Sequence, residues 1–557
     1  MIEENKLKII PLGGLEEVGK NMTLFEYKGK ILIVDMGFQF PGDAMPGVDY
    51  IIPNISYLKR KEKNILGVVF THGHYDHIGA IPYTLDKIGN PPLFATSLTK
   101  GIIEKRQQEF PNVAKLNMKE IGREDTILLP PFKIKTFPQN HNIPDCIGLV
   151  IETPIGKIMH TGDFKFDHTP VADKPADISK IATLCNGGVL LLMSDSTNSE
   201  VAGNSISEKV IQENLETIFE KSKGRIIVTT FASLLSRVQE VINIAEKQGK
   251  KVLIDGYSMK SNVEIAIELG FLKVKNNTII SPQELKKYPD NKIVIICTGA
   301  QGEGEASLMK ISHKCHRFIA IKKGDAVILS SSIIPGNERG VQELKDQLSW
   351  QGAKIFHYQM IDIHTGGHAQ KEELKTMINI VRPKFFMPIH GSHYMLNIHK
   401  ELAMSVDIPE KNIVIPKNGQ IVELSKDSIK ILKKSVPANY VMVDGLGIGD
   451  VGEVVLHDRQ AMSKDGMFVI VIIVDSETGN VKQSPDIISR GFVYLRESKD
   501  LLRETRRKTI ALVESITKSP HPTNFTFVKN KIREDLGDFL FKKTKRRPMV
   551  LPVVIEV

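Results

Sequence analysis

The sequence predicts an α/β protein in which one α/β domain is inserted into another and a small α+β domain ends the chain. Three observations support this fold class. Short apolar runs that end at Gly, Asp or Asn fill the first 200 residues, helices and strands alternate from about residue 204, and a histidine-bearing turn after residue 385 resumes the earlier pattern. A chain of 557 residues has room for about three such domains.

The first domain is predicted to begin with residues 1–203. Its clearest strands are the runs ILIVD (31–35), NILGVVF (64–70), KIMHTGD (157–163) and GGVLLLMSD (187–195), and an amphipathic helix is predicted over 97–109. Apolar, β-branched runs of this length that stop at a polar residue are typical of strands. We therefore expect polar side chains to lie where these strands end.

Residues 204–355 are predicted to form the inserted domain. Helices are expected over 206–222, 233–249 and 260–270, and the strands RIIVTTF, KVLIDG, KIVIICTG and DAVILSSS lie between or after them. Strands separated by helices indicate a parallel α/β unit. The stretch 356–440 then returns to a helix, a strand and the turn that carries His390, and is predicted to be the second part of the first domain.

The end of the chain is predicted to be a linker over 441–465 followed by an α+β domain over 466–557. The segment 445–460 is Gly-rich and resembles a turn region, whereas MFVIVIIVDSETG predicts a strand and a turn. Helices are predicted over 501–516 and 525–544, and MVLPVVIEV predicts a final strand.

Composition limits the class of protein only broadly. The 74 Lys and Arg residues exceed the 65 Asp and Glu residues, and the resulting charge of +9 permits a polyanionic partner without requiring one. No stretch approaches the roughly 20 apolar residues of a membrane span, and the first residues contain no apolar signal segment. The four cysteines form no CxxC pair and are expected to be buried thiols, so we expect a cytoplasmic protein without membrane association.

The strongest chemical signal is the stretch from Thr71 to His77, THGHYDH, which follows a predicted strand. Its four ligand-type side chains, His72, His74, Asp76 and His77, fall on a turn, where they can converge. Neutral imidazoles and carboxylates suit Zn²⁺ or Mn²⁺. Because one ion does not comfortably take all four side chains, the motif predicts two adjacent metals.

Isolated residues at other predicted strand ends complete the ligand sets. The full prediction is His72, His74 and His141 for one metal, Asp76, His77 and His390 for the other, and Asp163 between them. Asp35, at the end of ILIVD, is predicted to orient the histidine turn from outside the ligand set. Two Zn²⁺ ions, or Mn²⁺ or Mg²⁺ in their place, would activate a water as the hydroxide nucleophile, with Asp76 among the catalytic residues.

With these motifs the sequence resembles the metallo-β-lactamase superfamily. Asp195 in SDSTNSE, His368 in HTGGHAQ and His390 in PIHG resemble its nucleic-acid-processing β-CASP branch, and the domain inserted between Asp195 and His368 fits that branch. The whole chain, including the endings GFVYLRES and RRPMVLPVVIEV, is similar to the ribonuclease J family. The resemblance implies an αββα metallo-β-lactamase sandwich, an inserted β-CASP domain and the C-terminal domain of that family.

The resemblance also implies an activity and partners. It implies metal-dependent hydrolysis of RNA, by 5′-to-3′ exonuclease action, endonuclease action or both, in RNA decay and maturation. It implies a homodimer or homotetramer, a paralogous subunit or other RNA-decay proteins as further partners, and no membrane.

The residues around the two outer motifs agree with catalysis on RNA. The leaving 3′-oxygen needs a proton, for which His368 is the best candidate, and Asp195 is placed to orient its imidazole. A purely structural or phosphate-binding histidine is the alternative. Glycines admit a phosphate close to backbone N–H groups, and Ser233 lies where a helix N-terminus could hold an anion or could simply be capped. The predicted RNA-phosphate contacts are Ser233, His364, Thr365, Gly366, Gly367 and His368.

The sequence departs from the family pattern at one place. The family usually has Asn and His in the segment where this chain has Leu234 and Ser236, and often a small polar residue where it has Gly366. In the family these positions help to hold the 5′-monophosphate of RNA. The departure affects the preference for a 5′-monophosphate end, but not the predicted metal ligands.

Three other functions are compatible with the same motifs. A DNA nuclease would differ only in its preference between RNA and DNA. A small-ester or thioester hydrolase would lack a use for the inserted domain and for the pair Asp195 and His368. A non-catalytic RNA-binding subunit would be expected to lose metal ligands, and this chain retains all of the predicted ones.

Overall fold

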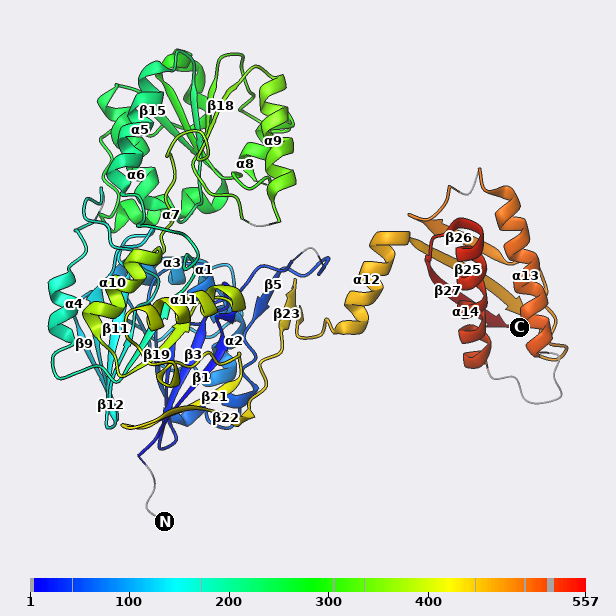
Figure 1. Ribbon diagram of the computed structural model, residues 1–557. Coiled ribbons are helices and arrows are strands. Elements are labelled where there is room, and N and C mark those ends of the chain that lie inside the picture. The colour runs from blue at the N-terminus through cyan, green and yellow to red at the C-terminus, as the bar shows by residue number, and fades with distance from the viewer. Residues whose placement is uncertain are drawn as a thin grey trace. The chain divides into compact units, whose positions relative to one another are not determined.

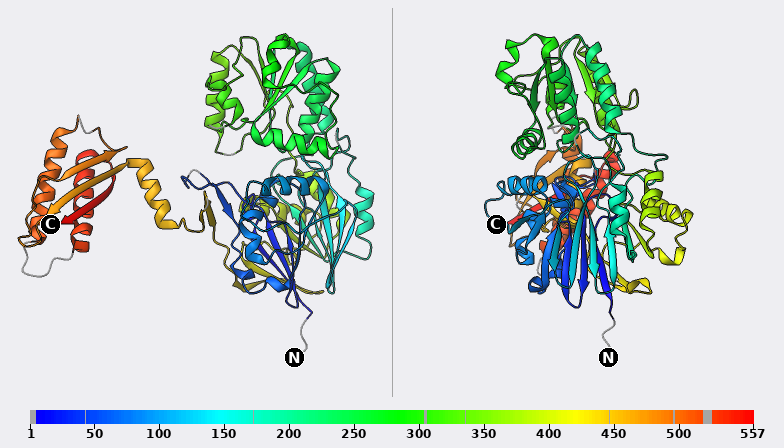
Figure 2. Two further views of the ribbon diagram at one scale, coloured as in Figure 1. Left: turned by 180° about the vertical axis from the view of Figure 1, so that it is seen from behind. Right: turned by 90° about the vertical axis from the view of Figure 1, so that its left-hand side faces the viewer.

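The computed structural model describes residues 5–42, 44–171, 173–303, 306–334, 336–445, 447–494, 497–517 and 525–557. The chain divides into two units, one of Met1–Gln39 with Ile52–Tyr440 and one of Phe40–Ile51 with Val441–Val557. Figures 1 and 2 show the elements of each unit.

Two β-sheets form the centre of the larger unit. The eight-stranded sheet has the order β22-β21-β1-β3-β4-β6-β7-β8 and the six-stranded sheet the order β19-β13-β12-β11-β10-β9. The strands of the first are β1 (Leu7–Gly13), β3 (Met22–Tyr27), β4 (Lys30–Val34), β6 (Ile65–Val69), β7 (Leu93–Ala95), β8 (Met118–Glu120), β21 (Gln420–Leu424) and β22 (Ile429–Ser435). Those of the second are β9 (Thr126–Leu129), β10 (Phe132–Pro138), β11 (Ile147–Thr153), β12 (Gly156–His160), β13 (Leu191–Asp195) and β19 (Phe385–Ile389).

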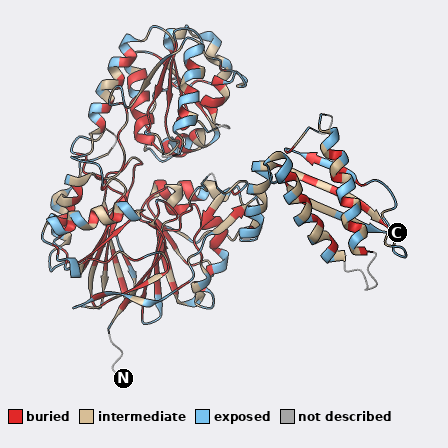
Figure 3. Ribbon diagram, turned by 45° about the vertical axis from the view of Figure 1, so that its right-hand side comes forward, coloured by how far each residue is buried: buried red, intermediate tan, exposed pale blue. Residues whose placement is uncertain are grey.

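Alternation along the strands separates the layers. On β4, Leu32 and Val34 pack in one cluster with Leu149 and Leu191 of the other sheet, because successive side chains of a strand point to opposite faces. The intervening Ile31 and Ile33 pack instead with the helices α1 (Tyr75–Ile78), α2 (Ile81–Thr84) and α3 (Ser97–Gln107). The outer face of the six-stranded sheet is covered in the same way by α4 (Ile178–Leu184), α10 (Lys371–Val381) and α11 (His393–Ser405). The predicted αββα sandwich is therefore confirmed, and Figure 3 shows its buried strands.

A separate parallel sheet follows α5 (Glu208–Lys221). Its order is β15-β16-β14-β17-β18, and every neighbouring pair in it is parallel. The strands are β14 (Ile226–Thr229), β15 (Lys251–Asp255), β16 (Ile293–Cys297), β17 (Ala326–Leu329) and β18 (Lys354–His357). Helices α5, α6 (Leu235–Lys247) and α7 (Tyr257–Glu268) pack on one face, and α8 (Ser307–Ser312) and α9 (Glu338–Trp350) on the other.

The chain then returns to the sandwich. β19 pairs with β13, and β21 pairs with β1, so residues after the parallel sheet complete both sheets of the sandwich. This return makes the parallel sheet an insertion, as the sequence predicted.

The smaller unit contains a three-stranded sheet of order β26-β25-β27, made of β26 (Asp486–Arg490), β25 (Met467–Val474) and β27 (Met549–Glu556). Helices α13 (Lys499–Thr517) and α14 (Phe525–Thr544) pack on one face of it. The turn-like region 445–460 differs from the expectation, because α12 (Glu453–Asp465) begins within it. Gly452 precedes this helix, and Leu456 of the helix is buried with Val451 and Val48. Val48 lies about 400 residues earlier in the sequence, so this contact leaves no local signal.

The burial of the cysteines and the apolar character of the helices can be compared with what the sequence predicted. The expectation of buried thiols is confirmed for Cys146 and Cys297, whereas Cys185 is half-buried and Cys315, which lies three residues beyond the end of α8, is exposed. None of the helices that the structure describes combines the length and the apolar character that a membrane span requires.

Candidate metal centre

The histidine turn lies between a strand and a helix of the sandwich. β6 ends at Val69, His72 and His74 lie in the turn, and Asp76 and His77 lie in the first turn of α1. β4 runs parallel to β6, so Asp35 at its end lies beside the turn. Asp35 accepts hydrogen bonds from the backbone N–H of Thr71 at 2.8 Å and from Nδ1 of His77 at 2.8 Å. Its predicted position beside the turn is the one the structure gives.

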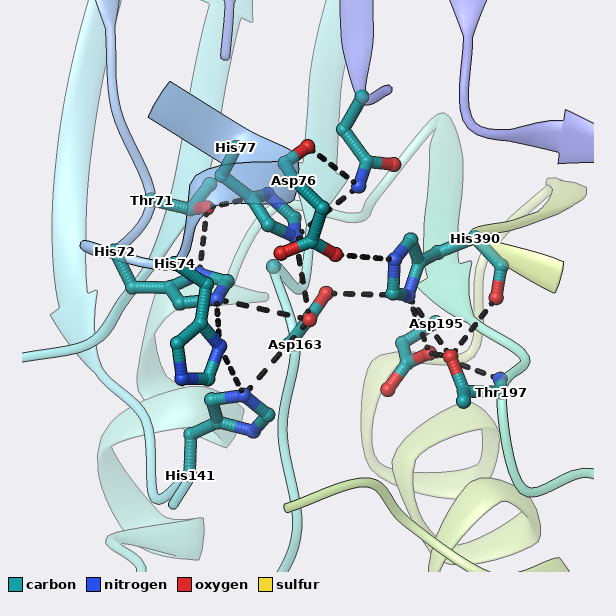
Figure 4. A network of polar contacts seen from close by, with 12 residues as sticks. Thr71, His72, His74, Asp76, His77, His141, Asp163, Asp195, Thr197 and His390 are labelled. Carbon is teal, nitrogen blue, oxygen red and sulfur yellow. Dashed lines mark hydrogen bonds and ion pairs between the residues drawn. The ribbon is translucent and has the colours of Figure 1, made fainter. Parts of the chain in front are cut away.

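The other predicted ligands reach the turn because four strands of the second sheet point the same way. β10 and β12 both run antiparallel to β11, and β13 and β19 run parallel to β12. Their carboxyl ends therefore share one edge of the sheet. The residues at or just beyond these ends are His141, Asp163, Asp195 and His390, and Figure 4 shows them converging on the turn.

Three imidazoles and one carboxylate form the first group of possible ligands. Nδ1 of His74 lies 3.0 Å from Nε2 of His72 and 3.2 Å from Nε2 of His141. Oδ2 of Asp163 lies 3.7 Å from Nε2 of His72 and 3.9 Å from Nε2 of His141. The side chains of His72, His141 and Asp163 are buried, so these nitrogens face one another and not solvent.

The second group contains Asp163 again, with Asp76, His77 and His390. Oδ2 of Asp163 lies 3.2 Å from Nε2 of His77, and Oδ2 of Asp76 lies 3.3 Å from Nε2 of His390. In each group, one ligand atom from every residue lies within 4.8 Å of the others. All seven predicted metal ligands thus fall into two clusters that share Asp163.

The protonation of the first group favours a metal. Burial and the neighbouring His77 hold the pKa of His72 well below its ordinary value, and burial with the neighbouring His74 does the same to the pKa of His141. Burial lowers the pKa of His74 to about 4. These rings are therefore neutral near pH 7, which is the form in which imidazole binds a metal.

The second group favours positive charge. Burial lowers the pKa of His390, but the carboxylate of Asp163, with Asp195 and Asp76, raises it overall to about 10. Burial raises the pKa of Asp76, but His77 and His390 bring it far below its ordinary value. A cluster of carboxylates that attracts protons onto its histidines is equally suited to a divalent cation.

Asp195 and His368 form a pair beside the second group. Nδ1 of His368 donates to Oδ2 of Asp195 at 2.8 Å. Oδ1 of Asp195 accepts from the backbone N–H and the hydroxyl of Thr197 at 3.0 and 2.8 Å, which fixes the carboxylate. Burial lowers the pKa of His368, but Asp195 raises it above its ordinary value. The structure therefore brings together the two residues that the sequence placed in one catalytic role.

The glycines before His368 lie close to the metal cluster. The carbonyl oxygen of Gly367 accepts from Nδ1 of His141 at 2.6 Å. A Cβ at Gly367 would lie 2.4 Å from the His141 ring, so only glycine fits this close approach. Gly366 lies beside the Asn198 side chain, and Thr365 is buried.

The remaining predicted phosphate contacts lie near the end of β14. The His364 ring is 6.4 Å from that of Phe231, two residues before Ser233, and burial lowers the pKa of His364 to about 3. Ser233 is half-buried just before α6. A phosphate contact at Ser233, His364 or the glycines stays a prediction.

Several residues of the site were not predicted from the sequence. The hydroxyl of Thr197 lies 2.8 Å from Nδ1 of His390, and Nδ2 of Asn21 lies 3.2 Å from Nε2 of His77. Thr197 follows Asp195 within the motif SDSTNSE and could have been found there. Asn21 gave no signal, because it lies in a short turn far from every motif.

Four family models match successive parts of the chain. They are described as the metallo-beta-lactamase superfamily (residues 15–210), the ribonuclease J beta-CASP domain (223–348), the Zn-dependent metallo-hydrolase RNA specificity domain (356–416) and the ribonuclease J C-terminal domain (454–557).

Curated relatives match over the whole length. Ribonuclease J 1 of Streptococcus pyogenes is 41% identical over 554 residues, which cover 100% of this chain and 98% of the relative. Ribonuclease J of Thermus thermophilus is 39% identical and ribonuclease J2 of Bacillus subtilis 36% identical, each over 99% of this chain and over 96% and 99% of the respective relative. A crystal structure of a protein of unknown function from Enterococcus faecalis matches 75% of this chain and 100% of its own with a TM-score of 0.56 and 16% identity, which shows a shared fold alone.

The sandwich, its histidine turn and the inserted sheet define a metallo-hydrolase of the metallo-β-lactamase superfamily, β-CASP branch. Relatives that are more than a third identical from end to end narrow the class further. The chain belongs to the ribonuclease J family, as the sequence predicted.

Proposed function

We propose that this chain is a metal-dependent ribonuclease, which hydrolyses phosphodiester bonds of RNA at the cluster centred on Asp163. The observation that carries the proposal is the sharing of Asp163 between two buried groups of metal-ligand side chains. The full-length relatives named ribonuclease J and the RNA specificity match supply the substrate class.

The donor atoms fit two divalent metals. His72, His74 and His141 would hold one ion, Asp76, His77 and His390 the other, and Asp163 would lie between them. Nδ1 of His74 lies 3.0 Å from Nε2 of His72 and 3.2 Å from Nε2 of His141, so three ring nitrogens face one buried point, as the ligands of one metal ion do. Imidazole and carboxylate donors suit Zn²⁺, and Mn²⁺ or Mg²⁺ are the alternatives. When bound, such a pair lowers the pKa of a water and neutralises charge on the phosphate.

His368 is proposed as the proton donor to the leaving oxygen. Its Nδ1 is occupied by Asp195, so Nε2 is the ring nitrogen that can carry the transferred proton. Because Asp195 raises the pKa of this ring, a larger share of it is protonated than in an isolated histidine. Thr197 and Asp195 would hold the ring in place while the RNA binds.

Weak selection of a 5′-monophosphate is proposed as well. The two side chains that depart from the family pattern are already occupied within the protein. Leu234 is completely buried, and the hydroxyl of Ser236 donates to the backbone carbonyl of Asn142 at 3.2 Å. Neither side chain is available to a phosphate, which favours endonuclease action over 5′-to-3′ exonuclease action.

Assembly through the C-terminal sheet is proposed for the oligomer. α13 and α14 cover one face of the sheet, and apolar residues of the other face remain partly exposed. Strand register aligns Val469 with Ile488, Val471 with Val553 and Ile473 with Ile555 on this face. Ile488, Val553 and Ile555 are 43%, 41% and 43% exposed. A homodimer or homotetramer would cover these side chains. The proposed location is the cytoplasm, where thiols such as that of Cys315 remain reduced. A paralogous subunit or other RNA-decay proteins could bind in addition.

The test uses one RNA, labelled internally and at its 3′ end, with either a 5′-monophosphate or a 5′-triphosphate. Internal fragments from both RNAs are expected, and they should disappear with a chelator and in the variant His74→Ala, Asp76→Ala. Mononucleotide release from the monophosphate RNA alone would show a selective 5′ exonuclease instead. Equal behaviour of the wild type and the double variant would overturn the ribonuclease proposal. Cleavage of DNA in preference to RNA would replace it with a DNA nuclease.

A further inference from the structure

A basic cleft lies in the C-terminal domain, within the smaller unit. It has a volume of about 480 Å³, and four cations line it along α13: Lys499, Arg503, Arg506 and Arg507. Leu502 and Ile510 also line it. This set is called the α13 cleft below. None of the seven predicted metal ligands and none of the predicted phosphate contacts is among the described residues that line it.

Helical periodicity places the four cations on one side of α13. Arg503 lies four residues after Lys499, and Arg506 and Arg507 lie three and four residues after Arg503. Side chains at these spacings are neighbours on the surface of a helix, and the next neighbour in the series is Ile510. Like charges at this spacing destabilise a helix. Residues 441–557 contain 19 basic and 16 acidic residues, so four cations on one side of a single helix are a local concentration of charge.

Little of this charge is neutralised within the described part of the chain. Arg503 lies 3.7 Å from Asp500, and both side chains are largely exposed. The nearest other acid of the helix, Glu504, is engaged by Lys543 of α14 at 2.6 Å and is attracted more weakly to Arg507. Nε of Arg506 donates to the carbonyl oxygen of Pro485 at 3.1 Å, which holds its guanidinium at the wall of the cleft.

We propose that the α13 cleft binds the phosphate backbone of RNA at a distance along the strand from the bond being hydrolysed. Arginine presents a planar fork that matches phosphate oxygens, and three of the four cations are arginines. No aromatic side chain is among the described residues that line the cleft, so it offers phosphate contacts and no surface on which bases stack. A protein partner would require an apolar anchor, whereas the cleft offers only Leu502 and Ile510.

This inference rests on RNA being the substrate, and the test separates the two. The full-length variant Arg503→Gln, Arg507→Gln removes two cleft charges. The matched control, Arg533→Gln, Lys542→Gln, removes two exposed charges of the same domain from α14, outside the cleft. Binding of a single-stranded RNA is measured with a chelator present, so that no cleavage occurs, over a series of salt concentrations. Steady-state cleavage of the same RNA and of a tetranucleotide is then measured with metal.

The cleft variant is expected to bind the long RNA roughly tenfold more weakly and to lower the slope of log affinity against log salt by about 1.4, the loss of two phosphate contacts on a single strand. Its KM for long RNA should rise, while kcat and the cleavage of the tetranucleotide stay unchanged. Equal effects of both double variants, or none, would overturn the α13 cleft as an RNA site. Absence of RNA cleavage by the wild type would instead overturn the proposed function itself.

Discussion

Asp163 is the residue through which the two groups of ligands meet. Its carboxylate lies 3.2 to 3.9 Å from nitrogens of His77, His72 and His141. Burial raises the pKa of Asp163, but His390 and His77 hold it well below its ordinary value, so the charged carboxylate is favoured. Around this residue, each hydrogen bond from outside the cluster fixes the direction of one ligand.

Asp195→Asn is expected to reduce kcat by about 10²- to 10⁴-fold, the usual contribution of a proton donor, with little change in RNA affinity. The neutral amide no longer raises the pKa of His368, so less of the protonated ring is available. The measurement is single-turnover cleavage at saturating RNA. His368→Ala should give a similar loss, and the double variant should lose no more than either single one, because the two residues act as a unit. Losses that multiply would contradict this pairing.

Asp35→Asn is expected to weaken metal binding by about 10- to 100-fold, because it loosens His77 without removing a ligand. Metal content after dialysis and titration of the metal-free protein give the affinity, and excess metal should restore activity. Asp427→Asn, at a side chain that is 94% exposed, is the control and should change neither. Unchanged metal affinity in Asp35→Asn would show that the histidine turn is held by other contacts.

The residues of the site that could be predicted are those that stand in a recognisable local pattern of the sequence. The histidine turn, His141, Asp163 and His390 each stand at a strand end, and the direction of the strands then brings them together. Asn21 and the carbonyl of Gly367 also hold this cluster, but their partners lie 56 and 226 residues away, and any residue type could supply a carbonyl. Contacts of that kind follow from the three-dimensional fold and leave no pattern in the chain.

At the scale of elements, α6 connects the inserted sheet with the loop that carries His368. Arg237 of this helix is completely buried. Its guanidinium donates to the carbonyl of Ile363 at 2.6 Å and to the hydroxyl of Ser330 at 2.9 Å, and it pairs with Glu208 of α5 at 2.5 Å. One side chain thus holds two helices, the end of β17 and the start of the loop to His368.

Arg237→Met is expected to lower the free energy of unfolding by about 3–5 kcal/mol, because it leaves Glu208 buried without its main partner. Equilibrium unfolding in urea measures the change. Lys247→Met, at the end of α6, breaks the ion pair between this lysine, which is 68% exposed, and Glu216 of α5, and should cost no more than about 1 kcal/mol. Similar effects of the two substitutions would mean that the buried network contributes no more than a surface pair.

Elements were predicted well where their own pattern is strong. α14 has the bounds 525–544 that its apolar spacing predicts, and β25 begins at the predicted Met467. α12 was not predicted, because glycines dominate its approach and its buried face meets a segment from the beginning of the chain. The order of strands in each sheet also could not be read locally, since β19 and β21 join their sheets only after the insertion.

At the scale of the whole molecule, two units each have their own core. The clusters around β4, β11 and β14 belong to the larger unit, and the cluster of Phe468, Ile470 and Leu536 belongs to the smaller one. All predicted metal ligands lie in the larger unit. Removal of metal should therefore lower the stability of the larger unit and not that of the smaller one.

Chelation is expected to lower the unfolding temperature of the larger unit and to leave that of the smaller unit unchanged. A ligand at about 100 times its Kd stabilises the folded state by roughly 2.7 kcal/mol, and that amount is lost with it. Differential scanning calorimetry separates the two transitions. Leu536→Ala, which creates a cavity in the smaller core, identifies the second one. A uniform shift of both transitions would contradict two independently stabilised units.

The separation of Asp76 and His390, which are 314 residues apart in sequence, has a consequence during synthesis. At about 5–20 residues per second, a ribosome needs roughly 16–60 s between these two residues. For most of that interval the nascent chain carries the histidine turn, His141 and Asp163, but neither the proton donor His368 nor the last ligand, His390. The nascent ribonuclease therefore cannot cut the message from which it is being translated until the inserted domain has been made and β19 has joined the sandwich.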